Sequence, residues 1–186
     1  KDVSLDLCGK IENGKLRVDQ GVIAGCAGGL YDSIYEAASI LKGHTGGCGD
    51  YALSVYPGSQ PIMMELVRTG VIHDLMASGA TVRTAFCGPC FGAGDVPANG
   101  ALSIRHTTRN FPSREGSKPG SGQLSGVALM DARSIAATTA NGGILTPATD
   151  IDYDPTVPEH QDDPSSYDTR VYPGFGKGDD DALLKL

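Results

Sequence analysis

The strongest constraint on the fold is the repeated succession of a short apolar segment and an amphipathic helical pattern. The apolar segments are GVIAG, YALSVYP and TVRTAF, at residues 21–25, 51–57 and 81–86. Helical patterns follow the first at about 31–42 and the second at about 59–69 and 71–78. Strands that alternate with helices form a mostly parallel sheet covered by those helices. The sequence therefore predicts an α/β fold.

The remaining elements are predicted from shorter signals. Val3–Leu7 alternates apolar and polar residues, which favours an edge strand, and Asn13-Gly14 is typical of a hairpin turn. ALSIR at 101–105 is expected to be a strand, and Asp131 to cap a helix that runs to Asn141. The rest of the chain after residue 90 is rich in glycine and proline, and we expect it to be irregular.

Charge divides the chain into a balanced domain and an acidic tail. Ten of the 22 acidic residues but only three of the 15 basic ones follow residue 146, so acids and bases are equal before it. We expect a domain at 1–146 and an acidic linker or extended arm at 147–186. A balanced domain gives no electrostatic support to nucleic-acid binding. No apolar run approaches the roughly 20 residues of a membrane span, and no signal peptide opens the sequence, so a cytoplasmic protein is expected.

The five cysteines include the pair Cys87-Gly-Pro-Cys90, which suits either a redox dithiol or a metal site. A redox dithiol needs a helix beginning at its first cysteine, because the helix dipole lowers the thiol pKa. Here two glycines and a proline follow Cys90 within seven residues, which opposes a helix. The sequence therefore favours a metal site.

The carboxyl end of the predicted sheet brings a third cysteine into consideration. Cys26 follows the apolar segment 21–25 in a glycine-rich loop, and parallel strands bring it to the same edge as Cys87. Cys8 and Cys48 are expected to be structural. Three thiolates are an incomplete set for structural zinc, whereas they suit an iron–sulfur cluster that leaves one iron without a protein ligand.

Two arginines, Arg109 and Arg114, follow in the motif TTRNFPSREG. Guanidinium groups bind carboxylates through paired hydrogen bonds, so the motif favours a substrate with several carboxylates. The order of a strand-end cysteine, Pro-Gly-Ser before a helix, Cys-Gly-Pro-Cys, Arg-Asn-Phe-x-x-Arg and a small-residue helix resembles the aconitase family of iron–sulfur hydro-lyases. The resemblance covers about residues 21–145, and RVYPGFGKGDDD is similar to the linker that enters the family's swivelling last domain.

The resemblance implies a three-layer sandwich, like the family's third domain, and a hydro-lyase acting on a hydroxy di- or tricarboxylic acid. It implies that Cys26, Cys87 and Cys90 hold a [4Fe–4S] cluster and that Arg109 and Arg114 bind substrate. The family's serine base, histidine and acidic partners lie on other domains, so no catalytic residue is assigned here. The remaining domains would belong to the same or a companion chain. The isolated domain would be inactive, and it could lack the cluster.

Departures from the family pattern keep other functions open. Cys26 is followed by Ala27-Gly28 instead of Thr-Asn, Thr108 replaces an asparagine, and Asp131-Ala132 replaces Ser-Pro. The first two changes remove polar groups of the kind that tune a metal site. His106 is expected to have a local structural role. The alternatives are a non-catalytic regulatory or binding homologue, and a zinc-binding structural module that uses the three cysteines and one outside ligand.

Overall fold

The computed structural model describes residues 5–46, 49–109 and 121–160. The strands are β1 (Ile11–Glu12), β2 (Lys15–Leu16), β3 (Gln20–Ile23), β4 (Ala52–Val55), β5 (Thr81–Val82), β6 (Leu102–His106) and β7 (Gly126–Leu129). The α-helices are α1 (Gly25–Gly28), α2 (Tyr31–Leu41), α3 (Gln60–Arg68), α4 (Val71–Ala77) and α5 (Ala132–Ala140). Short 3-10 helices are η1 (Cys8–Lys10), η2 (Gly88–Phe91) and η4 (Ala148–Asp150).

A five-stranded parallel sheet with the order β5-β4-β3-β6-β7 forms the centre of the molecule. From β3 the chain moves outward to β4 and β5 on one side, and then returns to β6 and β7 on the other. The direction of winding therefore reverses between β3 and β6. In open α/β sheets, ligands bind beyond the carboxyl ends of the strands at such a reversal. The α/β fold with a parallel sheet is confirmed.

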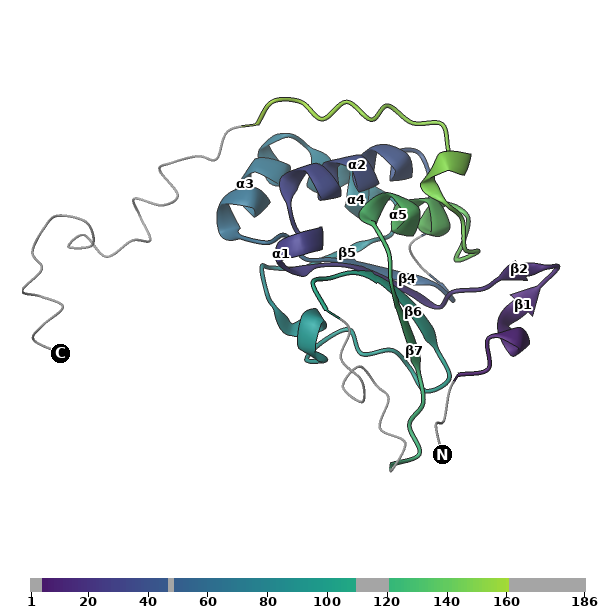
Figure 1. The fold of residues 1–186 in the computed structure, drawn as a ribbon. Helices are drawn as coiled ribbons and strands as arrows, with labels where there is room; N and C mark the ends of the chain where they lie inside the picture. The colour runs from purple at the N-terminus through teal and green to yellow at the C-terminus, as the bar shows by residue number, and fades with distance from the viewer. Residues whose placement is uncertain (1–4, 47–48, 110–120, 161–186) are drawn as a thin grey trace, which may run out of the picture.

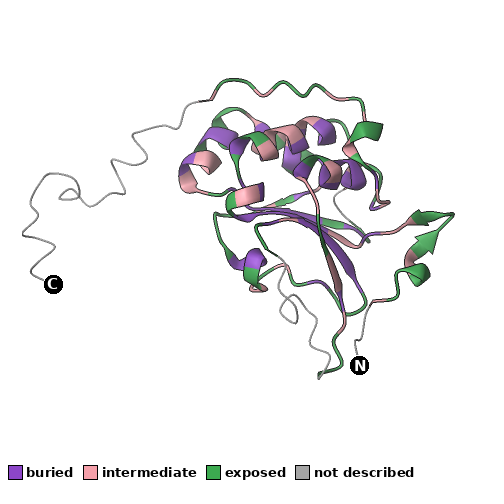
Figure 2. Ribbon diagram, in the orientation of Figure 1, coloured by how far each residue is buried: buried purple, intermediate pink, exposed green. Residues whose placement is uncertain are grey.

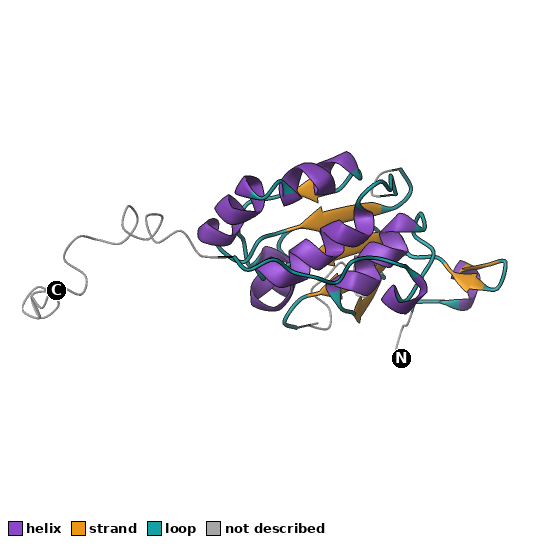
Figure 3. Ribbon diagram, turned by 90° about the horizontal axis from the view of Figure 1, so that it is seen from above, coloured by secondary structure: helices purple, strands orange, loops and turns teal. Residues whose placement is uncertain are grey.

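One face of the sheet carries the helical layer, in which α2, α3, α4 and α5 lie side by side (Figures 1 and 3). Ile34, Leu66 and Ile135 from these helices are fully buried with the strand residues Leu53 and Ile104. Burial is concentrated where the helices meet the central strands, while the β1–β2 hairpin is exposed (Figure 2). Burial of these aliphatic side chains contributes about 1.5–3 kcal/mol each.

The opposite face carries no α-helix among the described residues and is covered by the segment between β5 and β6, which contains η2 (Figure 1). Ser103 and Arg105 point to this face, because they alternate with Leu102 and Ile104 of the helical-face core along β6. Contacts from Arg105 to Pro89 and Asp95 join the segment to the sheet. The third layer of the sandwich is thus built from irregular chain.

Helix boundaries agree closely with the sequence prediction, and side-chain caps define the starts of α3 and α5. The Ser59 side chain accepts a hydrogen bond from the Ile62 N–H at the start of α3. Asp131 accepts from the N–H groups of Arg133 and Ser134 at the start of α5. The Asn13-Gly14 hairpin is confirmed as the turn between β1 and β2, with both residues at positive φ.

Two strand predictions were wrong, and one strand was missed. Leu5, Asp6 and Leu7, which were predicted to lie in an edge strand, are outside any strand, and the exposed helix η1 begins after them at Cys8. The strand predicted at 81–86 ends at Val82, so Cys87 comes five residues later. The sequence did not predict β7, in which Gly126 is a poor strand former.

Candidate metal centre at the carboxyl edge of the sheet

The carboxyl ends of β3 and β6 bound the candidate site, at the point where the winding of the sheet reverses. Cys26 follows β3 in the single turn α1, and Thr108 and Arg109 follow β6. The α1 turn contacts both β6 and η2, and η2 contains Cys90. Residues from three distant parts of the sequence therefore meet at one edge.

Gly25 allows the α1 turn to approach the Cys87–Cys90 turn closely. Gly25 has a φ of 73°, and a Cβ atom at this position would lie 2.5 Å from Cys90 Sγ. A glycine is the residue that satisfies both the left-handed backbone and the close contact. Cys90 Sγ therefore packs against the backbone directly before Cys26.

The Cys87–Cys90 turn is itself tightly folded. Gly88 lies so close to the Ala93 carbonyl and the Phe86 ring that a Cβ atom would be 2.0 Å from each. The rings of Phe86 and Phe91 pack edge to face on either side of the turn, with centroids 6.4 Å apart. Only the 3-10 helix Gly88–Phe91 follows Cys87, which agrees with the prediction that no regular helix begins there.

The three predicted cluster ligands lie close enough to affect one another electrostatically. Burial raises the pKa of the Cys90 thiol, and the charges of Cys87 and Cys26 raise it further, while a backbone hydrogen bond with Thr108 lowers it. Cys90 is buried, whereas Cys26 and Cys87 are exposed. Three thiolates brought together repel one another, which favours the protonated thiols. A bound cation displaces these protons, and its positive charge offsets the repulsion between the thiolates.

Three thiols are the donor type that holds iron–sulfur clusters in proteins. Within residues 5–46, 49–109 and 121–160, no set of three or more His, Cys, Asp and Glu side chains is arranged to hold a single ion. The cysteine ligands of an iron–sulfur cluster bind different iron atoms, so their sulfurs are spaced more widely than the ligands of zinc. Two exposed thiols and one buried thiol around a glycine cradle suit such a group.

Thr108 supplies a polar contact to the cysteines. Its Oγ1 atom lies 3.0 Å from Cys26 Sγ, within hydrogen-bond distance. Its backbone also bonds Cys90. The sequence suggested that threonine at this position weakens the polar surroundings, but the structure gives Thr108 contacts to two of the three thiols.

Gly28 reflects close packing beside the site. A Cβ atom there would lie 2.1 Å from the His106 carbonyl oxygen, which belongs to the backbone and cannot rotate away. Any larger residue would push α1 away from β6. The absence of a polar side chain at this position follows from the contact between these two elements.

Of the two arginines in the predicted substrate site, Arg109 lies within the described residues. Arg109 is exposed and lies three residues beyond β6, and its carbonyl oxygen accepts a hydrogen bond from Thr107 Oγ1 at 3.0 Å. Its position is on the same edge as the cysteines. Arg114 lies outside the described residues, as does Cys48.

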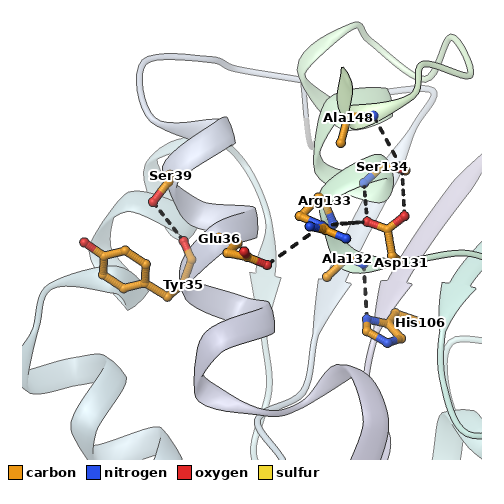
Figure 4. A network of polar contacts seen from close by, with 9 residues as sticks. All are labelled: Tyr35, Glu36, Ser39, His106, Asp131, Ala132, Arg133, Ser134 and Ala148. Atoms are coloured by element: carbon orange, nitrogen blue, oxygen red, sulfur yellow. Dashed lines mark hydrogen bonds and ion pairs between the residues drawn. The ribbon is translucent and has the colours of Figure 1, made fainter. Parts of the chain in front are cut away.

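His106 links β6 to the start of α5 (Figure 4). Its Nδ1 atom accepts a hydrogen bond from the Ala132 N–H at 3.1 Å, so Nδ1 carries no proton. Burial lowers the pKa of His106, the charge of Asp131 raises it and that of Arg133 lowers it. These contacts support the local structural role expected from the sequence.

The fold places the chain in a recognised class of proteins. It is an open parallel α/β domain with a thiol site at the reversal of its sheet. A family model described as "Aconitase family (aconitate hydratase)" matches residues 2–137. The chain is a member of the aconitase family.

Its relatives include large subunits of one enzyme. The 3-isopropylmalate dehydratase large subunit of Thermoanaerobacter pseudethanolicus is 36% identical over 129 residues, which covers 67% of this chain and 30% of the relative. The subunit of the same name from Nitratidesulfovibrio vulgaris is 35% identical over 129 residues, covering 69% and 31%. That of Moorella thermoacetica is 34% identical over 140 residues, covering 73% and 31%. The chain thus spans about a third of the length of these relatives.

No helix in the described part of the chain combines the length and apolar character needed to cross a membrane.

Proposed function

We propose that this chain is the cluster-bearing domain of a hydro-lyase that acts on a hydroxy di- or tricarboxylic acid. The observation that carries the proposal is the approach of Cys26, Cys87 and Cys90 from two separate turns. Membership of the aconitase family supports the same reading. We also infer that residues 1–146 form the domain and that 147–186 lead to a further domain.

In this proposal, the three cysteines hold a [4Fe–4S] cluster. When bound, the cluster supplies Lewis-acid chemistry toward a substrate hydroxyl and carboxylate. Arg109 and Arg114 orient the substrate through its carboxylates, because a planar guanidinium forms two parallel hydrogen bonds with such a group. Thr108 orients Cys26 and Cys90 through the contacts described above.

The relatives suggest the first substrate to test. They are named for 3-isopropylmalate, a hydroxy dicarboxylate, which falls in the class proposed for this chain. Because they are called large subunits and are about three times as long as the match, we infer that further domains or a companion chain complete the enzyme. A cytoplasmic location would suit an exposed cluster, because thiols stay reduced there.

Anaerobic reconstitution with ferrous iron and sulfide tests the cluster. The wild-type chain is expected to gain a broad visible absorption band with acid-labile sulfide, and Cys87→Ser to lose both. Cys8→Ser is the matched control, because Cys8 is an exposed thiol in η1 outside the site. A wild-type chain that contains zinc and forms no chromophore would support the zinc module instead.

The substrate role is tested separately with the complete enzyme. Arg114→Lys is expected to reduce the rate of 3-isopropylmalate dehydration at least about tenfold, because lysine cannot form the paired hydrogen bonds. Arg17→Lys serves as the control, since Arg17 pairs with Glu12 and Asp50 away from the carboxyl edge. Unchanged kinetics for Arg114→Lys would remove this residue from the site. A chain that binds the cluster but completes no active enzyme would favour the non-catalytic homologue.

A further inference from the structure

Arg105, in the middle layer of the fold, is the largest fully buried side chain among the described residues. A guanidinium group stays charged in proteins, and it carries five N–H donors. Burying it is costly unless these donors are paired. Its position in β6, on the face away from the helices, therefore calls for a specific set of acceptors.

The fold offers those acceptors from two different layers. On the sheet, Nε donates to Ser103 Oγ at 3.0 Å and Nη2 donates to Gln20 Oε1 at 3.2 Å. On the covering segment, Nη1 donates to the Pro89 carbonyl at 3.0 Å and Nη2 donates to the Asp95 carbonyl. One planar group thus connects two strands to two points on the segment that carries Cys87 and Cys90.

The contact with Pro89 acts directly on the candidate site. The Pro89 carbonyl belongs to the peptide that joins Pro89 to Cys90, so a hydrogen bond to it fixes the plane of that peptide. The orientation of this peptide determines where the Cys90 side chain points. Cys90 Sγ in turn packs against Gly25, next to Cys26.

Asp95 fastens the other end of the same segment. Its carboxylate accepts a hydrogen bond from the Tyr56 hydroxyl, and it forms an ion pair with Arg83 at 3.3 Å. Burial and the hydrogen bond with Asp95 raise the pKa of Tyr56 to about 12, so its hydroxyl keeps the proton it donates. Because Arg83 precedes the cysteine turn and Asp95 follows it, these contacts close the segment into a loop.

Irregular chain explains why an arginine is needed. Among the described residues, those from 84 to 99 belong to no strand, so the buried carbonyls of this segment need donors from elsewhere. Ser103 Oγ also donates to Gln20 Oε1 at 2.8 Å, which orients the oxygens that Arg105 uses on the sheet. The sheet face is therefore prepared to hold this guanidinium.

We propose that Arg105 is a positioning residue for the thiol site: it holds the Cys87–Cys90 turn against β6 so that Cys90 faces Gly25 and Cys26. Arg105 acts through the Pro89 and Asp95 carbonyls. The proposal concerns the thiols proposed above as cluster ligands. Its test uses the metal-free chain, so it is decided whether or not reconstitution succeeds.

The test is the rate at which iodoacetamide alkylates each cysteine of the reduced chain, followed by peptide mass spectrometry. Arg105→Met keeps the bulk of the side chain but removes its donors. Cys90 alkylation is expected to rise about tenfold or more, because loss of hydrogen bonds from a charged donor lets the turn open more often. In Arg105→Lys, the alkylation rate of Cys90 is expected to be intermediate. The alkylation rate of Cys8 is expected to be unchanged in both variants.

Two controls separate positioning from general stability. Arg17→Met removes an arginine remote from the turn and is expected to leave the Cys90 rate unchanged. Amide exchange in α5 is expected to stay as slow in Arg105→Met as in the wild type. A Cys90 rate that does not change in Arg105→Met, or a rise matched by equal loss of protection in α5, would overturn the proposal.

A second variant keeps the test decisive if Arg105→Met does not fold. Ser103→Ala retains the arginine and removes the oxygen that receives its Nε donor. The Cys90 rate is expected to rise about threefold, since one hydrogen bond is lost and the others remain. No rise in this folded variant would also overturn the proposal.

Discussion

The close contact between Gly25 and Cys90 leads to a prediction that joins stability to the site. In Gly25→Ala, the new methyl group would lie 2.5 Å from Cys90 Sγ, well inside normal contact distance. The backbone would also hold a non-glycine residue at a φ of 73°. The left-handed backbone costs about 1–2 kcal/mol, and an overpacked side chain costs about 1–3 kcal/mol. We expect a total loss of about 2–5 kcal/mol.

Urea unfolding of matched variants separates the two contributions. Gly43 has a φ of 83°, and nothing lies within 4 Å of a Cβ atom built there. Gly43→Ala therefore carries the backbone cost alone, about 1–2 kcal/mol. The difference between the two variants measures the clash with Cys90.

A double-mutant cycle identifies the clashing atom. Cys90→Ala removes the sulfur, so the combination Gly25→Ala with Cys90→Ala is expected to cost less than the sum of the single changes. The saving should approach the contact contribution of about 1–3 kcal/mol. Equal losses for Gly25→Ala and Gly43→Ala, together with additive effects in the cycle, would refute the packing of Cys90 on the α1 turn.

Two further predictions concern α5 and its contact with β6. His106 accepts a proton less readily in the folded state, so its contribution to stability is complete above about pH 6.5 and is lost as the pH falls through its lower folded pKa. His106→Asn retains an acceptor for the Ala132 N–H and should flatten this pH dependence of the melting temperature in thermal melts. An unchanged pH profile in this variant would argue against the contact. Ile135→Ala should destabilise the chain by about 2–5 kcal/mol in urea melts because Ile135 is fully buried, whereas Leu129→Ala, at a half-exposed position of β7, should change stability by less than about 1 kcal/mol.

The parallel sheet and its helices could be predicted because local signals defined them. Ser59 and Asp131 are caps whose side chains reach their own helices, so their effect can be read over three or four residues. The short apolar segments at 21–25 and 51–57 contain β3, the central strand of the sheet, and its neighbour β4. The edges were harder, because β5 has only two residues and β7 contains a glycine.

The site was predicted only as a set of residue types. Sequence order brought Cys26 to the right edge, since its strand lies at the reversal of the sheet. The contacts that arrange the site depend on distant residues, such as Thr108, 82 positions from Cys26. Arg105 was missed, although one signal was present: it alternates with Leu102 and Ile104 in a strand that reads as buried. A charged residue in such a pattern indicates a buried polar contact with another segment.

The described part of the tail, residues 147–160, packs on the helical layer. Ile151, Tyr153 and Val157 contact the core, and the segment runs along the helices toward the start of α2 (Figure 1). There the His160 ring stacks on Tyr31, with centroids 4.0 Å apart. Because only two residues separate Tyr31 from α1, this contact brings residue 160 to the cysteine-bearing edge of the sheet. The apolar residues spaced along this acidic segment indicate that it packs on the helices. The overall composition of the segment did not predict this packing, because acidic residues dominate it.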